Sequence, residues 1–220
     1  MDAFLYPVLA VGYLALFVWS FRSFRESFFW GTSWVLFLIL TLVYDKAILS
    51  LGIFFGGSDL FEMLSLIRNL LRVLLVPTLA YVSLDVLRRI RVEWSEYFVV
   101  QALYHIYTFC LTVLGVLMNI LWVEFVPQKI NGVIQYLPQE TNFPLVTMLI
   151  FIPLFVSGYL VWQKVRWPIL LFGVLLSIVG GTVSFFLVQP GIGAVFEFLL
   201  MGSIVLTEQM LKPEDYQENT

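Results

Sequence analysis

Seven stretches of this sequence are each long and apolar enough to cross a lipid bilayer as an α-helix. A transmembrane helix needs about 20 mainly apolar residues, because the hydrocarbon core is about 30 Å thick and each helical residue rises about 1.5 Å. The stretches cover residues 3–21, 28–51, 60–87, 96–123, 144–163, 167–188 and 191–211. The sequence therefore predicts an all-α integral membrane protein, a bundle of seven transmembrane helices that forms one domain over residues 1–212.

The composition excludes several other classes of protein. Of the 220 residues, 60% are hydrophobic and 12% are charged, whereas about a quarter of a soluble domain is charged. A net charge of −3 and the absence of a long basic run argue against a nucleic-acid partner. One cysteine and one histidine are too few for a structural zinc site. We therefore expect no nucleic-acid partner, no bound metal and no cofactor.

The basic residues predict the orientation of the bundle. Eight of them follow the first, third, fifth and seventh stretches: Arg22, Arg25, Arg88, Arg89, Arg91, Lys164, Arg166 and Lys212. The connections after the other stretches contain only Lys129. Cytoplasmic loops of membrane proteins are enriched in lysine and arginine. We therefore expect the N-terminus outside and the C-terminus, with a short acidic tail over 213–220, in the cytoplasm, within a plasma membrane of the bacterial type.

Two prolines and one long connection should shape the bundle. Pro77 and Pro153 fall within membrane spans, where each is expected to kink its helix and free the carbonyl four residues earlier. Residues 124–143 form the longest connection between spans. We expect this connection to be an external loop that folds over the helix ends.

A face of small residues occurs in the sixth stretch. Gly173, Ser177 and Gly181 recur every four residues and so lie on one side of a helix. Small residues let neighbouring helices approach closely in a membrane. We expect this face to serve helix packing, and it is the candidate contact for a homo-oligomer.

The third stretch carries a polar face that does not belong against lipid. At about 100° per residue, an arc of about 120° contains Glu62, Ser65, Arg68, Asn69 and Arg72. Charged side chains within a bilayer normally face the bundle interior and pair with one another. Two arginines four residues apart also repel each other, so they require an anionic partner.

Other stretches offer partners at a similar depth. Asp45 of the second stretch and Glu197 of the seventh should lie in the external half of the bilayer. The fourth stretch has a polar face that includes His105, near mid-membrane, and Asn119, near the outer end. Lys46 should point away from Asp45 and extend its ammonium group to the membrane interface.

These residues together predict a pocket, open outward, that binds an amphiphilic ligand with an anionic head. Arg68 and Arg72 would hold the head, because guanidinium groups bind phosphate and carboxylate through paired hydrogen bonds. Asn69, Asn119 and His105 would be further ligand-binding residues. The expected partner is a membrane lipid or an isoprenoid.

Three carboxylates of the same region are candidate catalytic groups: Asp45, Glu197 and Glu62. Carboxylates held in an apolar environment can act as general acids and bases near neutral pH. The leading hypothesis is therefore an enzyme that modifies a lipid or an isoprenoid.

Three alternatives stay open. The polar face that contains His105 fits a transporter of a small anion or of a proton-coupled solute. The charged residues also fit a non-catalytic subunit or assembly factor that meets a partner helix. Finally, two arginines and three carboxylates could neutralise one another and only lock the bundle.

Overall fold

The computed structural model of the protein describes residues 2–26, 30–55, 58–123, 125–130, 133–138, 145–187 and 189–211. Within these residues, seven helical segments are long and apolar enough to cross a membrane, which confirms the predicted number of spans. This is the pattern of an integral membrane protein. The predicted acidic tail over 213–220 lies outside the described residues.

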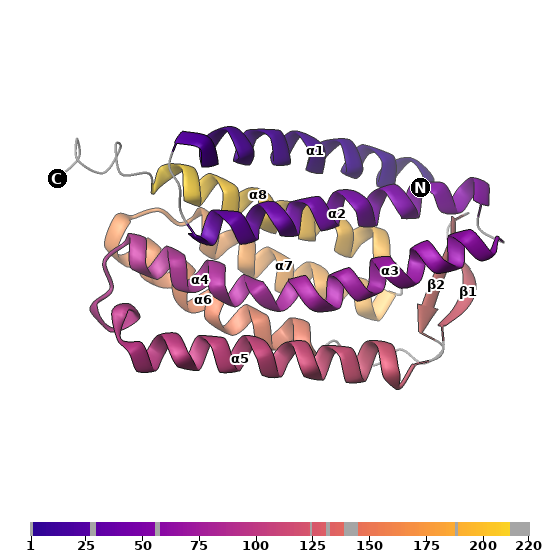
Figure 1. Cartoon of the computed structure of the whole chain (residues 1–220). Helices are drawn as coiled ribbons and strands as arrows, with labels where there is room; N and C mark the ends of the chain where they lie inside the picture. Colours follow the sequence, from indigo (N-terminus) through magenta and orange to yellow (C-terminus); the bar gives the residue numbers. More distant parts are fainter. Residues whose placement is uncertain are drawn as a thin grey trace.

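The spans form an antiparallel bundle. Its helices are α1 (Asp2–Glu26), α2 (Trp30–Phe55), α3 (Asp59–Leu75), α4 (Leu79–Arg89), α5 (Phe98–Val116), α6 (Leu145–Val165), α7 (Ile169–Leu187) and α8 (Pro190–Met210). The starts of α1, α3 and α8 and the ends of α2 and α7 lie at the end that carries the two strands, called the hairpin end below (Figure 1). The ends of α4 and α8 lie at the opposite end, where the short helix η2 (Glu93–Glu96) precedes α5.

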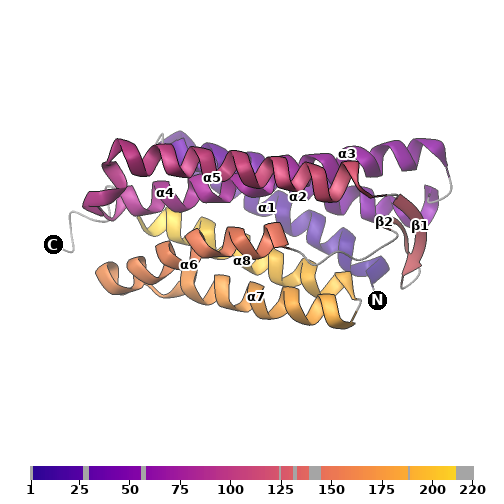
Figure 2. The same cartoon turned by 90° about the horizontal axis from the view of Figure 1, so that it is seen from below.

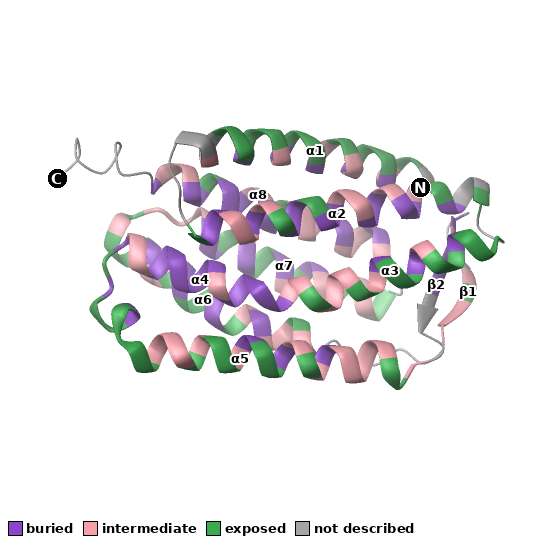
Figure 3. Ribbon diagram, in the orientation of Figure 1, coloured by how far each residue is buried: buried purple, intermediate pink, exposed green. Residues whose placement is uncertain are grey.

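The helices do not contribute equally to the interior. Buried residues gather on α2, α4 and α8, whereas the side chains of α1 and α5 are mostly exposed or partly exposed (Figure 3). Seen from below, α5 lies beside α3 and α4, and α6, α7 and α8 lie together on the other side of the bundle (Figure 2). Exposed apolar residues of α5, such as Phe98 and Phe109, form the kind of surface that faces lipid.

The two prolines affect their spans differently. Pro77 lies in the 3₁₀ turn η1 (Val76–Thr78), which interrupts the third span and separates α3 from α4. Helix α6 continues through Pro153, but Leu149, four residues earlier, loses its helical partner. The hydroxyl of Tyr107 on α5 donates a hydrogen bond of 2.7 Å to the Leu149 carbonyl oxygen. The freed carbonyl thus ties α6 to α5.

The connection expected to be a loop contains a β-hairpin. Strand β1 (Phe125–Ile130) pairs in antiparallel fashion with β2 (Val133–Pro138). The sequence carries Asn131-Gly132 between the strands, a dipeptide typical of two-residue hairpin turns. The ring centroid of Tyr136 on β2 lies 6.0 Å from that of Phe61 on α3. The hairpin therefore packs on α2 and α3 rather than forming an irregular loop.

The small-residue face of α7 packs within the chain. A side chain at Gly173 would collide with Ser203 of α8, and the Ser177 hydroxyl donates a 2.9 Å hydrogen bond to the Phe196 carbonyl oxygen. Gly181, by contrast, has open space on its free side. The predicted helix packing is therefore present between α7 and α8, and contact between copies through this face stays a prediction.

Candidate functional site

Five charged side chains meet between α2, α3 and α8. This charged cluster consists of Asp45 and Lys46 of α2, Arg68 and Arg72 of α3, and Glu197 of α8. The Lys46 ammonium nitrogen lies 2.7 Å from Oδ2 of Asp45 and 2.9 Å from Oε2 of Glu197. Lys46 therefore connects the two carboxylates across two helices.

The two arginines of α3 share Asp45, and Arg72 also pairs with Glu197. Nη2 of Arg72 lies 2.6 Å from Oε1 of Glu197, and its Nη1 lies 3.6 Å from Oδ1 of Asp45. Nε of Arg68 lies 3.7 Å from that same Oδ1 atom. The repulsion expected between arginines at positions i and i+4 is thus offset by carboxylates from other helices.

The cluster has a closed side and an open side. The side chains of Asp45, Lys46 and Arg68 are 1%, 2% and 6% exposed. Those of Arg72 and Glu197 are 39% and 21% exposed. The pair formed by Arg72 and Glu197 is therefore the most exposed part of the cluster.

The placement expected for Lys46 is wrong. Its side chain does not extend to the membrane interface but is buried among carboxylates. Consecutive helical residues are offset by about 100° around the helix axis, so Lys46 leaves α2 in a different direction from Asp45. Its long stem nevertheless brings the ammonium group back to that neighbour, because Glu197 of α8 supplies a second anion there.

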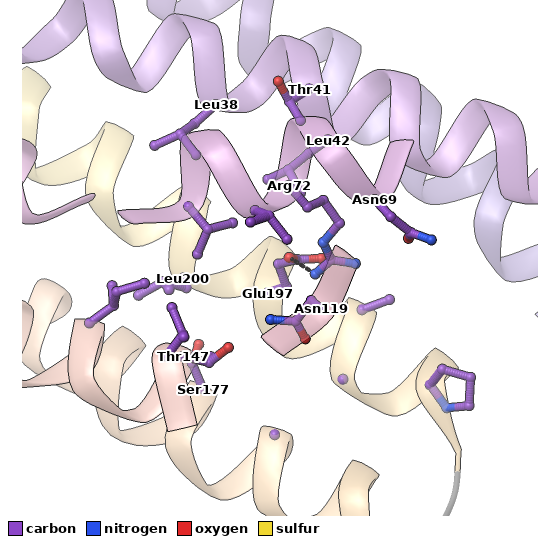
Figure 4. A pocket seen from close by; sticks show the side chains of 18 of the residues that line it. Leu38, Thr41, Leu42, Asn69, Arg72, Asn119, Thr147, Ser177, Glu197 and Leu200 are labelled. Carbon is purple, nitrogen blue, oxygen red and sulfur yellow. Dashed lines mark hydrogen bonds and ion pairs between the residues drawn. The ribbon is translucent and has the colours of Figure 1, made fainter. Parts of the chain in front are cut away.

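A cavity of about 480 Å³ opens beside the cluster. Arg72 and Glu197 point into it, joined by their ion pair, with Asn69 and Asn119 nearby (Figure 4). Gln135 of the hairpin also lines the cavity, and its amide donates a hydrogen bond to the Tyr6 hydroxyl. The remaining walls are mainly apolar and include Val76, Ile150, Phe151, Leu200 and Met201. Its volume is within the range of about 300–1,000 Å³ usual for small-molecule pockets.

Asn119 occupies an irregular helical segment. The end of the fourth span, η3 (Leu117–Leu121), is a π-helical turn. The Asn119 amide nitrogen donates a 3.0 Å hydrogen bond to the carbonyl oxygen of Gly115, which also lines the cavity. Short π-turns of this kind occur frequently at functional sites.

Two buried N–H donors of the site lack hydrogen-bond acceptors among the described residues: Arg68 Nε and Asn69 Nδ2. The Asn69 carbonyl oxygen accepts a 3.2 Å hydrogen bond from Nη2 of Arg68, which leaves the amide nitrogen free. Oδ1 of Asp45 also accepts no hydrogen bond in the described part of the chain, although two guanidinium groups lie within 4.0 Å of it. Buried donors without acceptors are destabilising, so each requires an explanation.

Two of the predicted site residues belong neither to the cluster nor to the cavity lining. Glu62 is exposed on the first turns of α3, beside Tyr136 of the hairpin. Burial raises the pKa of the Tyr136 hydroxyl, and the Glu62 carboxylate raises it further. His105 is exposed on α5, where its Nδ1 lies 3.1 Å from the Tyr81 hydroxyl. The structure therefore brings together Asp45, Glu197, Arg68, Arg72, Asn69 and Asn119.

Lys46 and Gln135 are site residues that the sequence did not predict. The sequence does contain an indication for Lys46, because this residue directly follows Asp45 and bears the opposite charge. Gln135 could only have been found by recognising the hairpin around Asn131-Gly132. The direction of its side chain would then follow from strand geometry, because residues two apart, such as Val133 and Gln135, point to the same face of a strand.

A second buried polar cluster lies at the opposite end of the bundle. Nη2 of Arg89 on α4 donates to the Thr32 hydroxyl at 2.8 Å and pairs with Asp85 and, at 3.5 Å, with Glu208 of α8. Oε2 of Glu208 has no hydrogen-bond partner among the described residues. Among the described residues this cluster contains one cation and two carboxylates, so its formal charge of −1 does not favour an anionic ligand.

No protein-family model matches this sequence, and no match was found to a curated protein or to a solved structure.

Proposed function

We propose that the protein binds, within the membrane, an amphiphilic ligand with an anionic head, a lipid or an isoprenoid. The observation that carries this proposal is a buried cluster with one more cation than anions, open to a largely apolar cavity. Lys46, Arg68 and Arg72 supply three positive charges, and Asp45 and Glu197 supply two negative charges.

Arg72 is the proposed anchor of the head group. It is the most exposed member of the charged cluster and lines the cavity. A guanidinium group has five N–H donors, and the hydrogen bond to Glu197 uses one nitrogen of Arg72. Its other nitrogens make no hydrogen bond with a described residue, although Nη1 lies 3.6 Å from Oδ1 of Asp45, and they would donate to a phosphate or carboxylate together with the amides of Asn69 and Asn119.

The apolar walls would hold the ligand's tail. Apolar side chains of α3, η1, α6 and α8 also line the cavity: Val73, Val76, Ile150, Phe151, Leu200 and Met201. An apolar chain against such a wall needs no polar partner, whereas a fully polar solute would leave its own groups unpaired there. This lining favours an amphiphile over a small polar anion.

Glu197 is the proposed acid or base if the ligand undergoes a reaction. Of the three candidate carboxylates, Glu197 lines the cavity, whereas Asp45 lies behind the arginines and Glu62 lies beside the hairpin. Proton transfer requires a group within hydrogen-bond reach of the reacting atom. Modification of a lipid or isoprenoid at this site would therefore depend on Glu197 first.

We propose that the hairpin end faces outward in a plasma membrane of the bacterial type. Seven described basic residues lie at or just after the ends of α1, α4 and α6, at the end opposite the hairpin: Arg22, Arg25, Arg88, Arg89, Arg91, Lys164 and Arg166. Lys129 of β1 is the one described basic residue at the hairpin end. Because cytoplasmic sides are enriched in such residues, this arrangement supports an external N-terminus and a cavity in the outer half of the bilayer.

Lipid binding to the purified protein tests the proposal. Native mass spectrometry of the detergent-purified wild type should detect a bound anionic amphiphile, and a fluorescent anionic lipid should compete with it. Arg72→Met should reduce binding about tenfold or more, since hydrogen bonds between charged groups contribute about 1.5–3 kcal/mol. The matched control is Arg22→Met, which removes the same charge from an exposed position of α1. Folded wild type that binds no anionic amphiphile would refute the proposal.

A further inference from the structure

We infer that the head of the ligand carries a single negative charge, and that Lys46 sets this number. The inference rests on the proposed function and specifies the class of ligand: a carboxylate or a phosphodiester rather than a phosphomonoester or a diphosphate. It follows from the charge balance of the cluster, from the position of Lys46, and from the donors left unpaired.

The charge balance leaves room for one negative charge. The cluster has three cations and two carboxylates, a net charge of +1 over the described residues. A monoanionic head brings the site to neutrality, a dianionic head leaves it at −1, and a zwitterionic head leaves it at +1. Uncompensated charge is costly in an environment of low dielectric constant, so the neutral combination is favoured.

Lys46 is the residue that creates the surplus. Without its ammonium group, the arginines and the two carboxylates would balance, and the site would not need an anion. Lys46 contacts both Asp45 and Glu197, which leaves fewer of their oxygens to occupy Arg68 and Arg72. Its side chain is 2% exposed, so solvent screens this charge very little.

The unpaired donors fit an oxyanion with two accepting oxygens. Arg68 Nε and Asn69 Nδ2 are buried, donate no hydrogen bond within the described part of the chain, and belong to residues that line the cavity; the nearest carboxylate oxygen to Arg68 Nε, Oδ1 of Asp45, is 3.7 Å away. Both atoms are donors, which water or an anion can satisfy but a cation cannot. Carboxylates and phosphodiesters each present two such oxygens with one shared charge.

A pair of ligands that differ by one charge tests the inference directly. Hexadecyl phosphate carries about 1.5–2 negative charges near neutral pH, whereas methyl hexadecyl phosphate, its diester, carries one. Hexadecanoate tests a carboxylate with one charge, and hexadecylphosphocholine tests a zwitterion. Binding to the wild type in detergent at pH 8 should be about tenfold tighter for the diester and for hexadecanoate than for the other two.

Changes in the charge of the cluster should shift this preference in a set order. Glu197→Gln raises the net charge to +2 and should favour hexadecyl phosphate over its diester. Lys46→Met lowers it to zero and should weaken diester binding about tenfold. The double variant Lys46→Met/Glu197→Gln returns the net charge to +1 and should restore the wild-type preference for the diester.

The outcomes separate the inference from the proposed function. If the wild type binds hexadecyl phosphate as tightly as its diester, or more tightly, the single-charge inference is wrong while anionic binding stands. If it binds none of the anionic probes, the proposed function fails as well. The wild-type comparison needs no substitution, so an unstable variant leaves the test decisive.

Discussion

The ammonium nitrogen of Lys46 on α2 lies 2.9 Å from Oε2 of Glu197 on α8, a contact between residues 151 positions apart in the sequence. Together with Asp45, this contact makes a lysine part of the bundle interior. The same contact leaves Arg72 on the cavity side of the cluster. This ion pair is therefore part of both the bundle interior and the proposed ligand site.

Replacing Lys46 should destabilise the protein as well as alter binding. Lys46→Met leaves Asp45 and Glu197 with fewer cations, and breaking a buried pair on one side costs about 3–5 kcal/mol. Thermal unfolding in detergent should show a clearly lowered midpoint. Lys46→Arg should retain more of the stability, because it keeps the charge. A midpoint unchanged in Lys46→Met would mean that the lysine contributes nothing to the interior.

The hydrogen bond from Tyr107 should matter only because of Pro153. Tyr107→Phe removes the donor to the Leu149 carbonyl and should cost about 1 kcal/mol. Pro153→Ala supplies a backbone N–H to that carbonyl, so Tyr107→Phe should cost much less in the Pro153→Ala background. Unfolding of the four proteins of this cycle measures the difference. Equal costs in both backgrounds would contradict the link between the two residues.

Filling the cavity from α7 should block the ligand without disturbing the bundle. Gly181 lines the cavity, and apart from its chain neighbours and the backbone of its own helix no atom lies within 4 Å of the position that a Cβ would occupy there, so the side chain of Gly181→Leu should project into free space. Binding of the anionic amphiphile should fall about tenfold or more. Gly202→Leu is the matched control, because Gly202 also has open space but does not line the cavity. Equal binding by both variants would show that the ligand lies elsewhere.

Single-cysteine labelling should reveal the orientation of the bundle. In a Cys110→Ala background, Ser58→Cys at the hairpin end should react with a membrane-impermeant maleimide added to intact cells. Glu93→Cys, in the connection after α4, should react only after the membrane is opened. The reverse pattern would place the hairpin end in the cytoplasm and overturn the proposed orientation.

Much of the fold was predictable because it depends on local properties of the chain. The length and hydropathy of each stretch define the seven spans, and Pro77 interrupts the third span because it has no N–H to donate. The hairpin was not predicted, because its strands are short and Asn131-Gly132 is a weak signal within a connection between long apolar spans. Helical periodicity placed Arg68 and Arg72 on an inward face, where the structure also has them.

The membership of the site was less predictable. Glu62 shares the helical face of Arg68 but lies near the start of α3, where the hairpin rather than the cluster is its neighbour. A site with Glu62 inside and Lys46 outside, as the sequence predicts, would contain two positive and three negative charges. The structure gives three positive against two negative among the described residues, so the sign of the site's net charge is reversed.

The sequence by itself determined the seven spans, the break at Pro77 and the inward direction of the arginines, because hydropathy and helical periodicity are set by residues close together in the chain. Only the tertiary structure decided which charges meet. A long side chain such as Lys46 can reach several directions from one backbone position, and the position of Glu197, on a helix distant in sequence, selects among them.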